Sequence, residues 1–219
     1  LRGARLVWTA HNFQRDNQRN GDRMERYFWP WFLKRVDGVI YMTRASAHRT
    51  SEDAPDLAKV PCAVVPHGHY RAVVEKAPHY RAAAHDLPRV IFFGAIAAYK
   101  QAWRVLDSFL EMPAGQAALV ICGKMSDRSP DLRLCDALEN LPEERVPEII
   151  VEDRFLPEEE LIGRIRAADL VVLPYGEVLN SGAALFALSV GRPLLASDAP
   201  VFAELQDHVG AEWVRVIKE

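Results

Sequence analysis

The chain has 219 residues, 49% of them hydrophobic and 26% charged, which excludes a disordered tail, a collagen-like chain and a small disulfide scaffold. At roughly 150 residues per domain, this length predicts one large domain or one and a half ordinary ones. The net charge of -3 divides into +6 over residues 1–50, with ten Lys/Arg and four Asp/Glu, and -9 over the rest, which fits either an anionic partner or a solvated basic face.

Short apolar runs rich in β-branched residues alternate along the chain with longer amphipathic runs. Strands are predicted over residues 6–9, 38–42, 63–65, 90–93, 118–122, 148–151, 170–173, 193–196 and 213–217. Helices are predicted over residues 24–34, 44–53, 100–111, 130–141, 158–167, 182–190 and 200–206. Strands that alternate with helices favour right-handed crossovers and parallel sheets, so the predicted class is α/β.

The regular pattern fails between residues 65 and 90, and we place a linker at residues 78–88. The domain after it, residues 89–219, has six predicted strands, enough for a complete doubly wound Rossmann-like domain. The part before it, residues 1–77, has three, and such a piece leaves a parallel sheet with an uncovered edge. We therefore expect it to be the back half of a second, truncated Rossmann-like domain.

In a doubly wound sheet, ligands bind beyond the carboxyl ends of the strands where the winding reverses. Two predicted loops lie there, residues 94–100 and 174–182. Gly94 permits a sharp turn, and Lys100 at the start of the next helix suits a phosphate. Asn180, Ser181 and Gly182 offer polar groups and backbone N–H groups at another helix start. A helix cap at Asn180 or Ser181, and a solvated lysine at Lys100, are the alternatives.

Two familiar phosphate-binding motifs are missing from the sequence. There is no Gly-x-Gly-x-x-Gly after a strand and no Gly-x4-Gly-Lys-Ser/Thr. A dehydrogenase and a P-loop NTPase are therefore disfavoured.

At the front of the chain, His11 follows a predicted strand, where an imidazole can act as a base or bind a substrate hydroxyl. A histidine that merely caps the strand end is the alternative. The next predicted helix carries an aromatic stripe at helical spacing, flanked by basic residues, and Pro30 is expected to kink it. Core packing and contact with a membrane surface both fit this stripe. Its members are Met24, Tyr27, Phe28, Trp31 and Phe32.

Three cysteines, Cys62, Cys122 and Cys135, have no metal-binding spacing, which predicts reduced thiols in a cytoplasmic setting and no zinc site. No apolar run approaches the length of a membrane span, and no signal peptide is evident.

Several segments, taken in order, resemble motifs of the GT-B glycosyltransferases, in particular the large group 1 family that uses nucleotide sugars. The segments are TAHN at 9–12, VPHG at 65–68, FFG at 92–94 with Lys100, FLP at 155–157 with Leu161, ADLVVLP at 168–174, and ALSVGRP at 187–193 followed by Ser197 and Asp198. The form Pro-Tyr-x5-Ser-Gly at 174–182 looks like a variant seen among exopolysaccharide and lipid-linked-sugar transferases.

The resemblance implies a donor-binding domain at 89–219, an acceptor-binding domain before it, and site residues in both. It implies catalytic roles for His11 and Glu177 and acceptor-side roles for Asn12 and Arg15. The donor-binding residues that we expect are Gly94, Lys100, Arg104, Gly123, Lys124, Phe155, Leu156, Asn180, Ser181 and Gly182.

The sequence also departs from the family pattern. Ala95 stands where the family has an arginine, so Lys100 and Arg104 must supply the charge. The two glutamates of the family's Glu-x7-Glu motif fall on Val178 and Phe186, and Glu177 is one residue out of register with the first.

We therefore expect transfer of a sugar from a UDP- or GDP-sugar to a hydroxyl acceptor, in polysaccharide or glycolipid synthesis. The nucleotide sugar is a substrate, and no cofactor or metal is expected. The expected partners are this donor, a saccharide or lipid-linked acceptor and an anionic membrane surface, but no nucleic acid. The expected location is the cytoplasm, with peripheral attachment to the inner face of the membrane left open. A non-catalytic nucleotide-sugar-binding module and a UDP-sugar epimerase are the alternatives.

Overall fold

The computed structural model describes residues 3–11, 23–78 and 87–217, and of residues 23–26 the backbone only. The chain divides into two compact units, Leu1–Gly68 and His69–Glu219. We call them unit 1 and unit 2 and describe each by itself.

Unit 1 contains a small parallel sheet with the strand order β1-β2-β3. Its elements are β1 (Val7–Thr9), α1 (Arg23–Leu33), β2 (Gly38–Tyr41), α2 (Arg44–Asp53), the short 3₁₀ helix η1 (Pro55–Lys59) and β3 (Cys62–Val64). The core of this unit is formed by Ala10, Val36, Val39, Tyr41, Ala54 and Leu57, with Trp8, Phe32, Leu33, Ala47 and Val60 packed against it.

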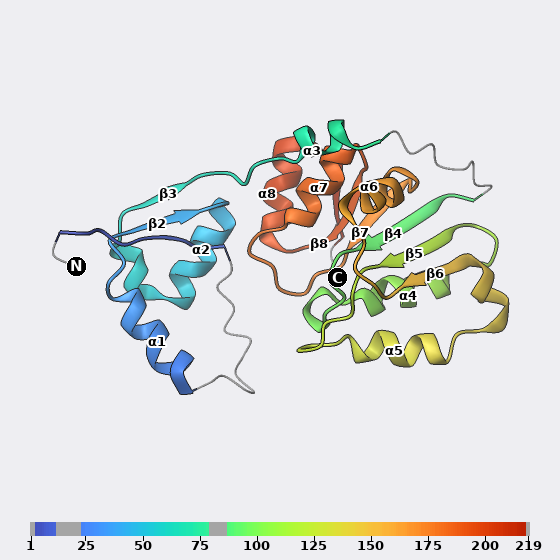
Figure 1. The fold of residues 1–219 in the computed structure, drawn as a ribbon, viewed down its shortest axis with the longest axis horizontal. Helices are drawn as coiled ribbons and strands as arrows, with labels where there is room; N and C mark the ends of the chain where they lie inside the picture. Colours follow the sequence, from blue (N-terminus) through green and yellow to red (C-terminus); the bar gives the residue numbers. More distant parts are fainter. Residues whose placement is uncertain (1–2, 12–22, 79–86, 218–219) are drawn as a thin grey trace. The chain divides into compact units, whose positions relative to one another are not determined.

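Unit 2 is built on a parallel sheet with the strand order β6-β5-β4-β7-β8-β9. Its elements are α3 (Arg71–Lys76), β4 (Arg89–Phe93), η2 (Ala98–Lys100), α4 (Ala102–Glu111), β5 (Ala118–Cys122), α5 (Leu132–Glu139), η3 (Glu143–Glu148), β6 (Ile149–Glu152), α6 (Glu158–Arg166), β7 (Leu170–Leu173), α7 (Gly182–Val190), β8 (Leu194–Ser197), α8 (Pro200–Val209) and β9 (Val214–Ile217). Figure 1 shows α4 and α5 on one face and α3, α6, α7 and α8 on the other. This is the doubly wound arrangement, in which the winding reverses between β4 and β7.

The expected class, α/β with parallel sheets, is confirmed, and each predicted strand is present with its ends shifted by two residues or fewer. The boundary between the units differs from the expected one, because residues 69–77 belong to unit 2. Within them, α3 packs on α7, and the Tyr70 N–H donates to Ser189 Oγ at 3.0 Å. The Arg166 guanidinium also donates to the carbonyls of Val74 and Pro78, both at 2.8 Å. The segment is therefore fastened to unit 2 by specific bonds.

A buried arginine caps the C-terminal end of α4 in unit 2. Arg145 Nη1 donates to the carbonyls of Leu110 at 3.2 Å and Met112 at 2.7 Å, and Nη2 donates to that of Phe109 at 2.9 Å. Its Nε lies 2.8 Å from Glu148 Oε2, in an ion pair with little exposure. The last carbonyls of a helix have no partner within the helix, and a cation there also suits the helix dipole. Arg145 thus donates to three carbonyls at once, of which, within the described part of the chain, only that of Phe109 also accepts a backbone N–H, from Met112 at 3.2 Å.

The aromatic stripe of α1 is only partly core. Phe32 packs against the core, and Trp29, which lies off the stripe, contacts the Trp8 ring at a centroid distance of 5.8 Å. Tyr27, Phe28 and Trp31 are instead 75%, 46% and 52% exposed. The prediction that the whole stripe packs in the core is therefore wrong. The inward face of the helix includes Phe32 and Trp29 and leaves the other three described members of the stripe exposed. The helix continues through Pro30. Within the described ranges, no helix combines the length and the apolar character needed to cross a bilayer.

Candidate donor site at the sheet reversal

The loops that follow β4 and β5 lie against each other in unit 2. The Gly94 N–H donates to Cys122 O at 3.0 Å, and the Ile96 N–H donates to Lys124 O at 2.9 Å. Gly94 and Gly123 have positive φ values of 98° and 143°, and a Cβ on Gly123 would overlap the carbonyl group of Gly94. The two glycines are thus brought together, and both positions require the absence of a side chain.

Lys100 lies at the reversal itself, and its ammonium is turned toward both loops there. Its Nζ would be 3.2 Å from a Cβ on Gly94 and is 5.3 Å from the centroid of the Tyr175 ring, which belongs to the loop after β7. Burial lowers the pKa of this ammonium to about 8. Among the residues that the structure describes, no carboxylate forms an ion pair with it. A half-buried cation without a counter-ion among the described residues is suited to an anionic ligand.

The expectation that Lys100 lies at the start of the helix after β4 is wrong. Lys100 ends η2, and α4 begins only at Ala102. The Trp103 N–H of α4 already donates to the Asp131 carboxylate at 3.2 Å, and burial raises the pKa of that carboxyl group. A phosphate would therefore meet a carboxylate at this helix start. Arg104, which we expected beside the diphosphate, has its guanidinium 5.5 Å from the Trp103 ring centroid.

The start of α7 offers the second polar feature of the reversal. Ser181 is the N-cap residue of α7, and its Oγ accepts a hydrogen bond from the Ala184 N–H at 3.2 Å. The alternative that Ser181 caps the helix is thus confirmed. A Cβ at Gly182 would lie 3.1 Å from the Tyr70 hydroxyl, so this turn is closely approached by the segment that precedes α3. Asn180, just before the cap, is half-buried.

An aromatic cluster occupies one of the two places where the resemblance implies a glutamate. Phe186 is buried, with its ring centroid 5.3 Å from that of Tyr70 and 6.1 Å from that of Phe93. Val178 is half-buried, and Glu177 beside it is exposed. The contacts of the described residues do not join the Glu177 carboxylate to Lys100 or to Ser181.

The remaining predicted donor residues lie on the loops after β5 and β6. Lys124 Nζ is 3.3 Å from Asp153 Oδ1, and the Met125 N–H donates to the same oxygen at 2.8 Å. Phe155 is 81% exposed, whereas Leu156 is buried and cannot face a ligand without movement. The two loops are therefore joined through Asp153, with the Phe155 ring at their surface.

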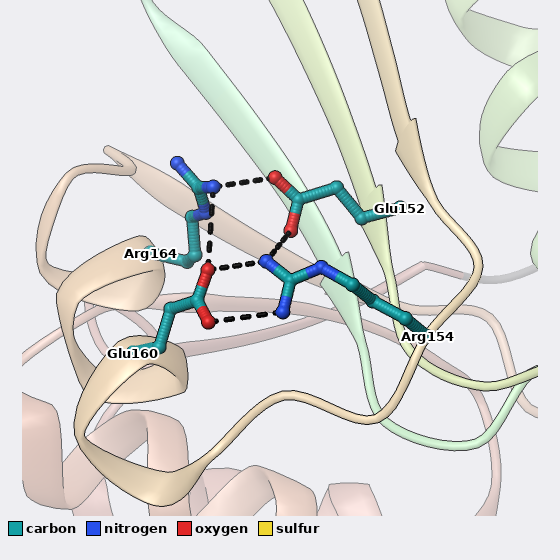
Figure 2. A network of polar contacts seen from close by, with 4 residues as sticks. All are labelled: Glu152, Arg154, Glu160 and Arg164. Atoms are coloured by element: carbon teal, nitrogen blue, oxygen red, sulfur yellow. Dashed lines mark hydrogen bonds and ion pairs between the residues drawn. The ribbon is translucent and has the colours of Figure 1, made fainter.

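A network of charged side chains anchors the loop that carries Phe155 (Figure 2). The Arg154 guanidinium bridges Glu152, at 3.2 Å, and Glu160, and Arg164 pairs with Glu152 at 2.5 Å. The network joins the end of β6 to α6, so both ends of the intervening loop are held. The neighbouring thiol of Cys122 is buried, which raises its pKa to about 12.

In unit 1, His11 follows β1 and is exposed. Its ring centroid is 6.3 Å from that of His67, whose Nδ1 lies 2.7 Å from Gly68 O. Because a carbonyl only accepts, Nδ1 of His67 carries the proton. The structure thus brings together two histidines of which the sequence indicated one. Asn12 and Arg15, the other acceptor-side residues, lie outside the described residues.

The described residues meet the requirements of neither a metal site nor a disulfide. Within residues 3–11, 23–78 and 87–217, no group of three or more His, Cys, Asp or Glu side chains could hold a metal ion. The three cysteines form no disulfide.

Sequence reasoning missed Gln101 and Tyr175, which lie beside Lys100. Tyr175 is part of the Pro-Tyr motif, so its place after β7 could have marked it. Gln101 carries no such signal, because a glutamine in the sequence does not indicate a left-handed backbone conformation.

Comparison with curated proteins gives a partial match. The chain is 32% identical over 152 residues to a GDP-mannose:glycolipid 4-beta-D-mannosyltransferase of Xanthomonas campestris pv. campestris. The alignment covers 68% of this chain and 40% of the relative, so the chain spans less than half the length of the curated relative. No protein-family model matches.

Comparison with solved structures covers nearly the whole chain. Sucrose-phosphate synthase from Thermosynechococcus elongatus has a TM-score of 0.71 over 97% of this chain and 54% of its own, at 19% identity. An alpha,alpha-trehalose-phosphate synthase (UDP-forming) from Burkholderia vietnamiensis has a TM-score of 0.64 over 86% of this chain and 50% of its own, at 14% identity. At such identities the likeness concerns the fold, and the expected GT-B fold is confirmed.

Proposed function

Since the chain is related to glycosyltransferases of the GT-B fold, we propose that it transfers a sugar from a nucleoside diphosphate sugar to a hydroxyl acceptor. The donor is assigned to unit 2 and the acceptor to unit 1. The observation that carries the proposal is the half-buried Lys100 ammonium at the reversal between β4 and β7, without a counter-ion among the described residues. Ligands of doubly wound domains bind at this place.

In the proposed reaction, the acceptor oxygen forms a bond to the anomeric carbon, and the bond from that carbon to the diphosphate breaks. Negative charge grows on the departing diphosphate, where Lys100 and the backbone N–H groups at the start of α7 would stabilise it. The acceptor hydroxyl loses its proton, for which His11 is our candidate base. No metal or cofactor is part of this scheme.

The donor and acceptor classes follow from the relatives. The Xanthomonas relative is named for GDP-mannose and a glycolipid, and the Burkholderia neighbour is named as UDP-forming. We therefore propose GDP-mannose as the first donor to test and a lipid-linked saccharide as the acceptor class.

Titration of the intact chain with GDP and with UDP by calorimetry tests this proposal. We expect one of the two nucleotides to bind, because both carry the diphosphate that Lys100 would meet. Absence of binding by either nucleotide at millimolar concentration would refute the proposal.

A non-catalytic nucleotide-sugar-binding module is a second candidate, favoured by Val178 and Phe186 in place of the two glutamates. Both candidates bind nucleotide, but only the enzyme consumes a nucleotide sugar when acceptor is supplied. The epimerase alternative would instead change the sugar of a UDP-sugar in the absence of any acceptor.

We further propose that α1 attaches the protein peripherally to an anionic membrane surface, where a lipid-linked acceptor would reside. Tyr27, Phe28 and Trp31 are exposed on this helix. Lys34 and Arg35 follow them, and the Arg35 guanidinium lies 4.3 Å from the Trp31 ring centroid. Exposed aromatic side chains with adjacent cations are typical of interfacial helices.

Co-sedimentation with lipid vesicles tests the attachment. We expect the chain to pellet with vesicles that contain phosphatidylglycerol more than with pure phosphatidylcholine vesicles. Trp31→Ser should reduce the pelleted fraction severalfold, whereas Trp213→Ser, which removes an exposed tryptophan of unit 2, should leave it unchanged. Equal binding to both vesicle types would contradict the electrostatic part of this proposal.

A further inference from the structure

Gln101 has a backbone conformation that is unusual for its residue type. With φ 52° and ψ 44°, it is the only non-glycine residue with positive φ among the described residues. This left-handed region is disfavoured for residues with a Cβ, and glycine is the usual choice there. Non-glycine residues held in such conformations cluster at ligand sites. A glutamine at this position, directly after Lys100, therefore indicates a use for the side chain.

The Gln101 side chain reaches from the loop after β4 to the loop after β7. A Cβ on Gly176 would lie 2.6 Å from Gln101 Nε2 and 3.1 Å from its Cδ, so the carboxamide rests against the backbone of Gly176. The Gly176 N–H in turn donates to Tyr99 O at 3.0 Å. Gln101 thus lies across the reversal, against the residue that follows Tyr175, and Lys100 faces the Tyr175 ring.

Two polar atoms at this place have no hydrogen-bond partner in the described part of the chain. They are Gln101 Oε1 and the hydroxyl of Tyr175, and both are buried. Buried polar side-chain atoms in folded proteins are nearly always paired, and exceptions often mark a ligand or a functional strain. Two such atoms on the facing loops after β4 and β7 indicate a missing partner.

The chemistry of a carboxamide oxygen restricts what that partner can be. The oxygen only accepts hydrogen bonds, and an ionised diphosphate also only accepts, so the two cannot pair. In a nucleotide sugar, the nearest donors to the diphosphate are the hydroxyls of the sugar. Lys100, the preceding residue, supplies the group that the diphosphate needs.

We propose that Gln101 is a ligand of the donor sugar, whose Oε1 accepts a hydrogen bond from a sugar hydroxyl while Lys100 meets the diphosphate. The inference rests on the proposed function and deepens it. A neutral amide would then perform part of the sugar contact that the resemblance assigns to two glutamates, which are Val178 and Phe186 in this chain. To reach the hydroxyl, the carboxamide turns out of its place over Gly176, a movement that breaks no hydrogen bond of Oε1.

Two substitutions separate the side chain from the backbone conformation. Gln101→Gly removes the carboxamide and suits the left-handed backbone, so we expect the unfolding temperature to stay the same or rise. Gln101→Met keeps the length of the side chain and removes the acceptor. The affinities of wild type and both variants for GDP, GDP-mannose, UDP and UDP-glucose are measured by calorimetry.

We expect both variants to bind the nucleoside diphosphate within about twofold of wild type and the corresponding nucleotide sugar about 5- to 10-fold more weakly, the effect of one lost hydrogen bond. If both affinities fall together, or neither changes, this inference is wrong while the proposed function stands. If wild type binds none of the four ligands, the proposed function fails and the inference with it.

Discussion

Lys100→Ala is expected to weaken nucleoside diphosphate binding at least about 30-fold, because removal of one member of a desolvated charge pair costs about 2 kcal/mol or more. The folded protein should lose no stability, since the substitution removes a half-buried ammonium that has no counter-ion among the described residues. Calorimetry with GDP and UDP measures the first effect, and thermal unfolding of the ligand-free chain measures the second.

Two other lysines serve as controls for Lys100→Ala. Lys124→Ala should have a smaller effect on nucleotide affinity, because Lys124 is exposed and already pairs with Asp153. Lys59→Ala, at an exposed position of unit 1, should have none. Equal effects of the three substitutions would show that the site lacks the specificity that we assign to Lys100.

The same ammonium makes the affinity depend on pH. In the ligand-free chain burial lowers the pKa of Lys100 to about 8, whereas a bound diphosphate favours the protonated form. The affinity should therefore be constant between pH 7 and about 8 and fall above that pH, by up to tenfold per pH unit. In Lys100→Ala this decline should disappear. A decline of equal size in that variant would assign the titration to another group.

Arg145→Ala is expected to destabilise unit 2 by about 3 kcal/mol or more, the usual result of breaking a buried ion pair from one side. The carbonyls of Leu110 and Met112 lose their donor, and that of Phe109 keeps only the Met112 N–H. The carboxylate of Glu148 stays behind with little exposure. For a chain of this length, the unfolding temperature should fall by roughly 10 °C. Calorimetric or spectroscopic melting measures it.

Two further variants test this explanation of the role of Arg145. Arg128→Ala removes an exposed guanidinium between β5 and α5 and should change the unfolding temperature little. Arg145→Lys keeps the charge but not the planar fork that reaches several carbonyls, and it should restore only part of the lost stability. Full restoration by lysine would mean that charge alone stabilises the end of α4.

The strands of unit 2 were readable from the sequence because a buried parallel strand is a short, nearly continuous apolar run. The runs at Ala118–Cys122 and Leu170–Leu173 match the observed β5 and β7 residue by residue. The reversal point follows from the order of such strands, and the loops with Gly94 and Lys100 follow from it. By contrast, α3 spans only six residues, too few for a helical period to be recognised.

Parts of the site depend on contacts between residues far apart in the sequence, and these could not be predicted. The spacing of aromatic residues in α1 does not say which face turns inward, and the contact of Trp8 with Trp29 decides that. In the same way, the carboxylate that occupies the start of α4 comes from Asp131, 28 residues beyond Trp103. The positive φ at Gln101 could not be predicted either, because glycine is the residue type that usually signals this conformation.

The attachment of α3 to α7 bears on where the chain can be divided between its two units. Hydrogen bonds join Tyr70 to Ser189, and Val74 and Pro78 to Arg166. The segment after Gly68 is therefore structurally part of unit 2. In a chimaera that exchanges unit 1, a join near Gly68 keeps this stretch with its own partners. A join at the composition change around residue 78 would separate it from them and expose the apolar side of α7.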